Sequence, residues 1–180
     1  IAAADRWNLQ PLYADDQAWQ RAFTLLEAGL DGYREFRGTL ADSAAALKAV
    51  IEYDLALSRE IEKLYTYAHL RHDEDLAESG AAAMFQQIAN FSTRAAEASS
   101  YIVPEMQAIA PATMNSFLAD ELLAPYKVYI EKILRHREHT RSEEVEELLA
   151  MAGEVCDAAE DIFRQLDNSD MTFGMIEDDK

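Results

Sequence analysis

The chain has 180 residues, which is enough for one domain with a buried core or for a tight pair of helical subdomains. Its 34 acidic residues outnumber its 16 basic residues, and a net charge of -18 repels nucleic-acid phosphate and anionic lipid. We therefore expect neither nucleic acid nor a membrane among its partners. The single cysteine, Cys156, excludes an internal disulfide and a cysteine-based zinc cluster, and it fits a cytoplasmic setting.

The composition favours helices almost throughout, because alanine is abundant whereas glycine (6) and proline (4) are scarce. No run of about 18 apolar residues is present, so we expect no membrane span. The first residues, IAAADRW, lack the basic and apolar regions of a signal peptide and do not start with Met. Both ends are expected to be trimmed ends of something larger.

Large apolar residues in WNLQPLY, Trp7 to Tyr13, predict an extended arm that docks on the body of the protein. Asp15 or Asp16 then caps a helix that ends at Gly38. Apolar residues at a spacing of three or four define the buried face of this helix: Trp19, Phe23, Leu26, Leu30 and Tyr33.

Two long helices follow and are expected to form an antiparallel hairpin. Asp42 or Ser43 caps the first of them, whose apolar period continues to about His72. The second begins around Asp75 after the connection HDED, and Pro104 stops or kinks it. Long helices need long partners, so the two should pack along their length.

Three prolines, Pro104, Pro111 and Pro125, can each occupy the first turn of a short helix, and they predict one or two such helices. A clear helix then covers 126–139. The next helix starts at Ser142, or at Thr140 with Glu143 in a capping box, and runs to about Leu166. Its end is followed by a DNSD turn and by MTFGMI, which is compatible with the start of a short strand.

The predicted fold class is therefore all-α, a long helical hairpin with further helices. We expect residues 1–180 to form a single helical region, and a subdivision into 1–103 and 104–180 stays open.

Two histidine pairs are the candidates for a metal site. His136 and His139 lie three apart in HREH, whereas HExxH and HxxEH place their histidines four apart, and a third ligand would have to come from elsewhere. Basic residues surround this pair, so we prefer a structural interpretation in which they favour the negative end of the helix dipole. His69 and His72 in HLRHDED are interpreted as a solvated hairpin tip rather than as ligands.

No other pattern indicates catalysis. Serines occur without a GxSxG turn, and no phosphate-binding glycine loop is present. A group of tyrosines could line a peptide groove, although we expect most of them to pack with the hydroxyl at the surface: Tyr53, Tyr65, Tyr67, Tyr101, Tyr126 and Tyr129. We therefore assign no catalytic, cofactor-binding or metal-ligating residue to this chain.

Four stretches together resemble the oligoendopeptidase F family of zinc peptidases, in family order and from Trp7 to Asp179. They are WNLQPLY with DDQAW, EKLYTYAHLRHDED, YIEKILRHREHTRSEEVEELLAMAGEV and FRQLDNSDMTFGMIEDD. The resemblance implies a helical N-terminal region that forms one wall of a deep peptide channel. In the family, the catalytic zinc lies on a later HExxH helix, where zinc and a glutamate base activate water.

This chain contains no HExxH, so the resemblance carries no catalytic or zinc-binding residue onto it. It implies short peptides as substrates of the parent enzyme, and a C-terminal catalytic domain of the same chain as the partner of this region. Two alternatives stay open. One is a free-standing helical scaffold or interaction module, and the other is a metal-binding bundle that uses the HxxH pairs.

Overall fold

The computed structural model describes residues 6–137, 158–160, 162–167 and 171. The chain divides into two compact units, Ile1–His139 and Thr140–Lys180. Its described residues form helices and turns without a strand, which confirms the predicted all-α class. None of the helices in this described part is long and apolar enough to cross a bilayer. The subdivision at Pro104 stays a prediction.

The arm is docked as predicted, with a turn inside it. Leu9 and Tyr13 are buried, and the backbone N–H groups of Leu12 and Tyr13 both donate to the carbonyl of Leu9. Helix α1 (Asp16–Gly29) follows, and Asp15 is its cap because the Asp15 carboxylate accepts the N–H of Ala18 at 2.7 Å. The arm therefore leads directly into the cap and the first turn of α1.

The helix predicted to end at Gly38 ends at Phe36, and it is not α-helical throughout. A 3₁₀ turn, η2 (Leu30–Gly32), separates α1 from the short helix α2 (Tyr33–Phe36). The break lies where Tyr53 enters: its hydroxyl donates to the carbonyl of Gly29, and its ring fills the space beside Gly32. An amphipathic pattern does not reveal this insertion, because the interrupted segment keeps its helical period.

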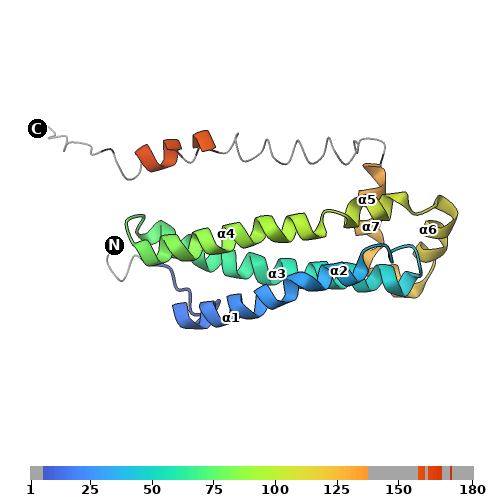
Figure 1. The fold of residues 1–180 in the computed structure, drawn as a ribbon, viewed down its shortest axis with the longest axis horizontal. Helices are drawn as coiled ribbons and strands as arrows, with labels where there is room; N and C mark the ends of the chain where they lie inside the picture. The colour runs from blue at the N-terminus through green and yellow to red at the C-terminus, as the bar shows by residue number, and fades with distance from the viewer. Residues whose placement is uncertain (1–5, 138–157, 161, 168–170, 172–180) are drawn as a thin grey trace, which may run out of the picture. The chain divides into compact units, whose positions relative to one another are not determined.

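Helices α3 (Ala44–Glu74) and α4 (Ser79–Ser99) form the predicted antiparallel hairpin (Figure 1). Ser43 caps α3 and accepts the N–H of Ala46 at 3.1 Å. The connection differs from the predicted HDED, since three of those four residues lie inside α3 and the loop is 75–78. Glu78 closes this loop, because its carboxylate accepts the N–H groups of the first turn of α4.

Short helices cover the other end of the hairpin. They are α5 (Ile102–Ala108), α6 (Pro111–Leu118), the 3₁₀ helix η3 (Glu121–Tyr126) and α7 (Lys127–Arg135). Pro104 and Pro111 lie in the first turns of α5 and α6, as predicted. Pro125 does not, because it lies inside η3, directly before α7.

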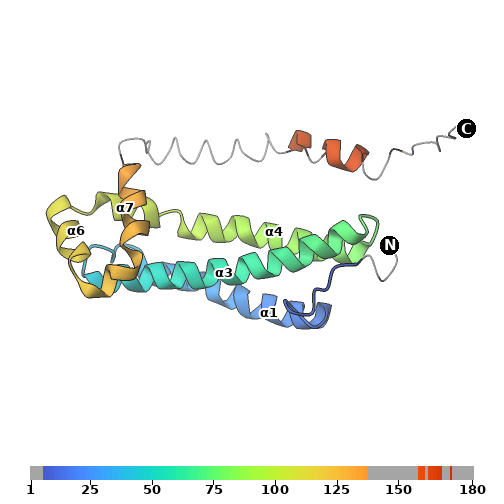
Figure 2. The same cartoon turned by 180° about the vertical axis from the view of Figure 1, so that it is seen from behind.

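The core of the first unit lies where α1, α3 and α4 meet, and Figure 2 shows both α1 and α4 running along α3. Trp19 stacks on Phe23 with ring centroids 5.3 Å apart, and Phe23 meets Phe91 of α4 edge-on at 5.6 Å. All three side chains are almost fully buried. The indole N–H of Trp19 donates to the carbonyl of Leu64 at 2.9 Å, so this buried polar group is satisfied.

The loop between α2 and α3 is held by a residue that comes much later in the chain. The carboxylate of Glu105 in α5 accepts the N–H of Gly38 and the N–H of Leu40, each at 3.0 Å. Gly38 has a φ of 83°, in the left-handed region that favours glycine. The turn and its clamp together set the direction in which α3 begins.

In the second unit, helical backbone is described at 158–160 and 162–165, which agrees with a helix reaching about Leu166. The N–H of Met171 donates to the carbonyl of Leu166 at 2.9 Å. The predicted caps Thr140 and Ser142, and the MTFGMI segment apart from Met171, lie outside the described residues.

Candidate functional site

The first histidine pair is only partly described. His136 is the residue that follows α7, and its N–H donates to the carbonyl of Ile133 at 3.2 Å. Lys132 and Arg135 occupy the last turn of α7, where positive charge favours the helix dipole. His139 lies outside the described residues, so the geometry of the pair is not defined.

The second histidine pair packs on an aromatic ring. His72 stacks on Phe85 of α4 with ring centroids 5.4 Å apart, and His69 lies 5.3 Å from the same ring. The imidazole Nε2 of His69 lies 3.6 Å from the carboxylate of Asp73. Both histidines are partly exposed near the end of α3 and also pack on Phe85, so the predicted hairpin tip contributes to the contact between α3 and α4.

Zinc does not fit the described residues. In that part of the chain, no three histidine, cysteine or acidic side chains gather in a way that could hold an ion. The two histidines of α3 are engaged with Phe85 instead, and stable zinc sites in proteins use at least three protein ligands. No metal-dependent step can therefore be assigned to these residues.

The tyrosines do not gather in one groove. One group, which we call the tyrosine junction, consists of Tyr33, Tyr53 and Tyr101. Tyr101 donates its buried hydroxyl to the carbonyl of Tyr33 at 2.7 Å, and the ring of Tyr53 meets Tyr33 edge-on at 5.2 Å. Tyr33 donates to the carboxylate of Asp54 at 2.7 Å. Desolvation by burial, followed by this hydrogen bond, raises the pKa of Tyr33, so its hydroxyl stays protonated beside the Asp54 carboxylate.

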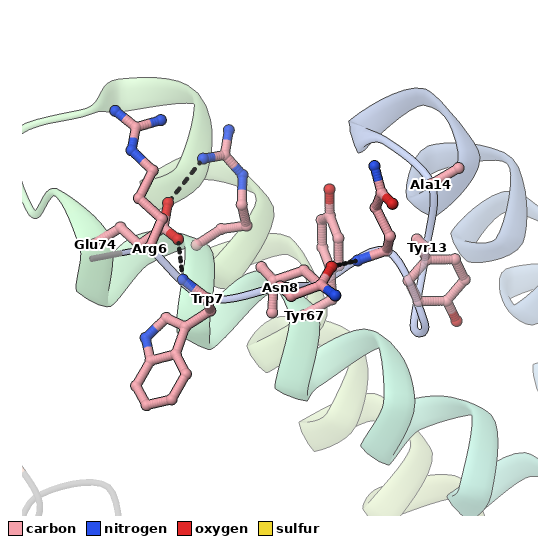
Figure 3. A pocket seen from close by; sticks show the side chains of 10 residues that line it. Arg6, Trp7, Asn8, Tyr13, Ala14, Tyr67 and Glu74 are labelled. Carbon is pink, nitrogen blue, oxygen red and sulfur yellow. Dashed lines mark hydrogen bonds and ion pairs between the residues drawn. The ribbon is translucent and has the colours of Figure 1, made fainter. Parts of the chain in front are cut away.

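A hollow of about 360 Å³ opens at the opposite end of the hairpin, between the arm and the last turns of α3 (Figure 3). We call this region the arm site. Aromatic and charged side chains dominate its lining, which comprises Arg6, Trp7, Asn8, Leu9, Gln10, Tyr13, Ala14, Tyr67, Arg71 and Glu74.

A chain of hydrogen bonds connects the arm, α1 and α3 at this site. The carboxylate of Glu74 accepts the backbone N–H of Trp7 at 3.0 Å, and it lies 3.4 Å from the guanidinium of Arg71. Arg71 in turn donates to Asp16 at 3.1 Å, and the hydroxyl of Tyr67 donates to the same carboxylate at 2.7 Å. Because these contacts are charge-assisted, they are stronger than bonds between neutral groups.

The electrostatics follow from this network. Burial opposes ionisation of Asp16, but the hydrogen bonds from Arg71 and Tyr67 outweigh it and hold the pKa of Asp16 below its ordinary value. The pKa of Tyr67 shifts in the opposite direction, because burial and then its hydrogen bond to Asp16 raise it. The site thus holds Asp16 as an anion opposite a cationic Arg71.

Tyr13 forms the inner wall of the hollow. Its ring meets Tyr67 edge-on at 5.5 Å, and the Nζ of Lys63 lies 4.7 Å from its centroid. The hydroxyl is buried and has no hydrogen-bond partner among the described residues. Burial, followed by the charge of Glu60, raises the pKa of Tyr13 to about 12.

The lining of the arm site holds no serine, cysteine or histidine, and its charged groups are engaged in structural contacts apart from Arg6. Sequence reasoning predicted the docked arm but missed the site. The available signal was the spacing of Tyr67, Arg71 and Glu74, which places three polar-tipped side chains on one face of α3.

Comparisons with known proteins agree with the resemblance found in the sequence. The family model described as Oligopeptidase F (Peptidase_M3_N) matches residues 105–173. Oligopeptidase PepF of Bacillus subtilis (strain 168) is 34% identical over 180 residues, which cover 99% of this chain and 27% of that protein. Group B oligopeptidase PepB of Streptococcus agalactiae (serotype III, strain NEM316) is 33% identical, over 97% of this chain and 29% of that protein.

Solved structures extend the match to the fold. The crystal structure of oligoendopeptidase-F from Enterococcus faecium superposes with a TM-score of 0.80 at 32% identity, and it covers 90% of this chain and 31% of that one. A putative peptidase from Chlamydophila abortus gives a TM-score of 0.68 at 29% identity, over 99% of this chain and 30% of that one. The chain thus spans less than a third of the length of these relatives. By sequence and by fold, it matches the N-terminal part of the oligoendopeptidase F family.

Proposed function

We propose that this chain is the N-terminal helical part of a longer, zinc-dependent oligoendopeptidase that cleaves short unfolded peptides in the cytoplasm. One observation carries the proposal: nearly the whole chain matches relatives named as oligopeptidases, and it accounts for only 27% to 29% of their length. The remaining part of the longer polypeptide would hold the zinc and the reacting groups.

The role proposed for the present residues is steric. The α3–α4 hairpin, stiffened by the core of Trp19, Phe23 and Phe91, would serve as one wall of the substrate channel. A rigid wall admits extended peptides and excludes folded proteins. It also positions peptides, and positioning lowers the entropic cost of reaching the transition state.

The first experiment is the intact mass of the native polypeptide, isolated from its source by immunoprecipitation. We expect a mass far above the 20.3 kDa of this chain. A native mass near 20.3 kDa would contradict the proposal, and a non-catalytic helical scaffold would then be the better account.

The second experiment compares peptide hydrolysis by the 180-residue chain and by the complete polypeptide, with quenched fluorescent peptides. We expect turnover only by the complete polypeptide, and we expect a zinc chelator to abolish it. Chelator-sensitive turnover by the 180-residue chain would overturn the assignment of a purely steric role.

A further inference from the structure

Trp7 stands out at the arm site because its backbone is fixed while its side chain is open. Its N–H is bound by Glu74, whose side chain is only 8% exposed, yet the indole itself is 61% exposed. Figure 3 shows the indole of Trp7 extending away from the arm and from α3. The backbone that carries this large aromatic side chain is therefore fixed before anything binds to the indole.

Exposure alone does not make a docking point, because single exposed apolar residues are normal on protein surfaces. Leu25 in α1 is more exposed, at 77%, but it does not line the hollow of the arm site. Trp7 does. It lines the hollow together with Tyr13 and Tyr67, so a partner could bury the indole and fill the hollow at the same time.

Tryptophan is also among the residue types that most often dominate binding at interfaces, and a fixed backbone at this position reduces the entropic cost of association. Arg6 adds a charge beside it, since no acidic side chain among the described residues pairs with its guanidinium. An occupant with an apolar side chain and a nearby carboxylate would therefore suit this surface.

Two observations favour one occupant of the surface around Trp7 over another. A second copy of this chain would bring a net charge of -18 toward an equal charge, which disfavours self-association. In the relatives, by contrast, roughly 70% of the polypeptide lies outside the matched part, because this chain covers only 27% to 31% of their length. We therefore expect the occupant to belong to the part of the longer polypeptide that this chain does not cover.

We propose that Trp7 and the hollow beside it form an intramolecular docking point, which a segment of the remaining part of the longer polypeptide covers. The inference rests on the proposed function, because it needs the longer polypeptide to exist. It goes further in naming the surface through which the helical N-terminal part is held to the rest.

Hydroxyl-radical footprinting read by mass spectrometry tests this inference, since it measures Trp7 and Leu25 separately in one sample. We expect strong labelling of both residues in the 180-residue chain. In the complete polypeptide we expect labelling of Trp7 to fall several-fold while labelling of Leu25 persists. Equal labelling of Trp7 in the two proteins would overturn the inference, as would protection of both residues alike.

A series of variants separates docking from folding. Trp7→Ala should lower the Tm of the complete polypeptide but leave that of the 180-residue chain unchanged, whereas Trp7→Phe should retain most of the stability. Leu25→Ala is the matched control and should affect neither. Protection of Trp7 that grows with the concentration of the 180-residue chain would identify a second copy as the occupant and would also overturn the inference.

The proposed function is judged by different readouts, native mass and peptide hydrolysis. A long, active polypeptide in which Trp7 is fully labelled would refute the docking point alone. A native mass near 20.3 kDa would instead refute the proposed function.

Discussion

The two ends of the α3–α4 hairpin are closed by different physical means. At the tyrosine junction, Tyr33, Tyr53 and Tyr101 contact one another's rings and backbone carbonyls, and Tyr101 is buried together with its hydroxyl. At the arm site, ionised groups join the arm to α3, a hollow remains open, and Trp7 is exposed.

The difference indicates what each end can do. The contacts among the tyrosines themselves join neutral rings, hydroxyls and carbonyls, so they vary little with pH or salt, and the hydrogen bond from Tyr33 to Asp54 is the charged exception. Charge-assisted contacts at a partly exposed site depend on both, and they leave surface available for a partner. We therefore expect the tyrosine junction to set stability and the arm site to respond to conditions and to binding.

The largest effect is expected from Gly32→Ala at the tyrosine junction. The new Cβ would lie 2.7 Å from Cζ of Tyr53, which is too close for real atoms. Overpacking of this kind should lower the free energy of unfolding by about 1–3 kcal/mol. Urea denaturation of the variant and of the wild type measures the change.

The double variant Gly32→Ala/Tyr53→Phe sharpens this test, because it removes the hydroxyl nearest to the new methyl group. Its loss of stability should be smaller than the sum of the two single losses. Simple additivity would show that a clash with Tyr53 is not the cause of the loss in Gly32→Ala.

A smaller effect is expected from Glu74→Ala at the arm site. The substitution leaves the N–H of Trp7 without its acceptor and removes one acidic neighbour of Arg71, which should cost about 1–2 kcal/mol. Amide hydrogen exchange of Leu12 and Tyr13 should accelerate more than exchange in the core. Glu62→Ala, at an exposed position of the same helix, is the control, and equal exchange in both variants would show that Glu74 does not hold the arm.

The smallest effect, and the one most sensitive to pH, is expected from Asp16→Asn. Because the fold holds the pKa of Asp16 below its ordinary value of about 3.9, the ionised carboxylate stabilises the folded state above that pH. The contribution disappears as the pH falls through the lower pKa of the folded state. At neutral pH it should be below about 1 kcal/mol, since the pair with Arg71 is partly exposed.

Chemical denaturation of wild type and Asp16→Asn from pH 7 to pH 2 measures this contribution. The two stabilities should differ most near neutrality and converge in acid, and added salt should reduce the gap. A gap that widens in acid would contradict the assigned direction of the pKa.

The sequence predicted the long helices because their apolar residues repeat with the helical period over many turns. It placed the caps to within one residue, with Asp15 and Ser43 among the alternatives. The break at Leu30–Gly32 could not be predicted, since it depends on a tyrosine that enters from another helix. Local patterns contain no information about such insertions.

The candidate site was predicted only in part. The apolar residues of WNLQPLY indicated a docked arm, and Leu9 and Tyr13 are indeed buried. The partners of the arm could not be deduced, because Trp7 and Glu74 are 67 residues apart in the chain. The contact of His69 and His72 with Phe85 could not be deduced for a similar reason, because this ring belongs to the next helix.

The two hydrogen bonds that Glu105 accepts have a consequence for folding during synthesis of the chain. The carboxylate that binds the N–H groups of Gly38 and Leu40 is synthesised 65 residues after Leu40. At ordinary translation rates this corresponds to a delay of about 3 to 13 seconds. During that interval water must solvate the two N–H groups, so the start of α3 acquires its final direction only once α5 has left the ribosome.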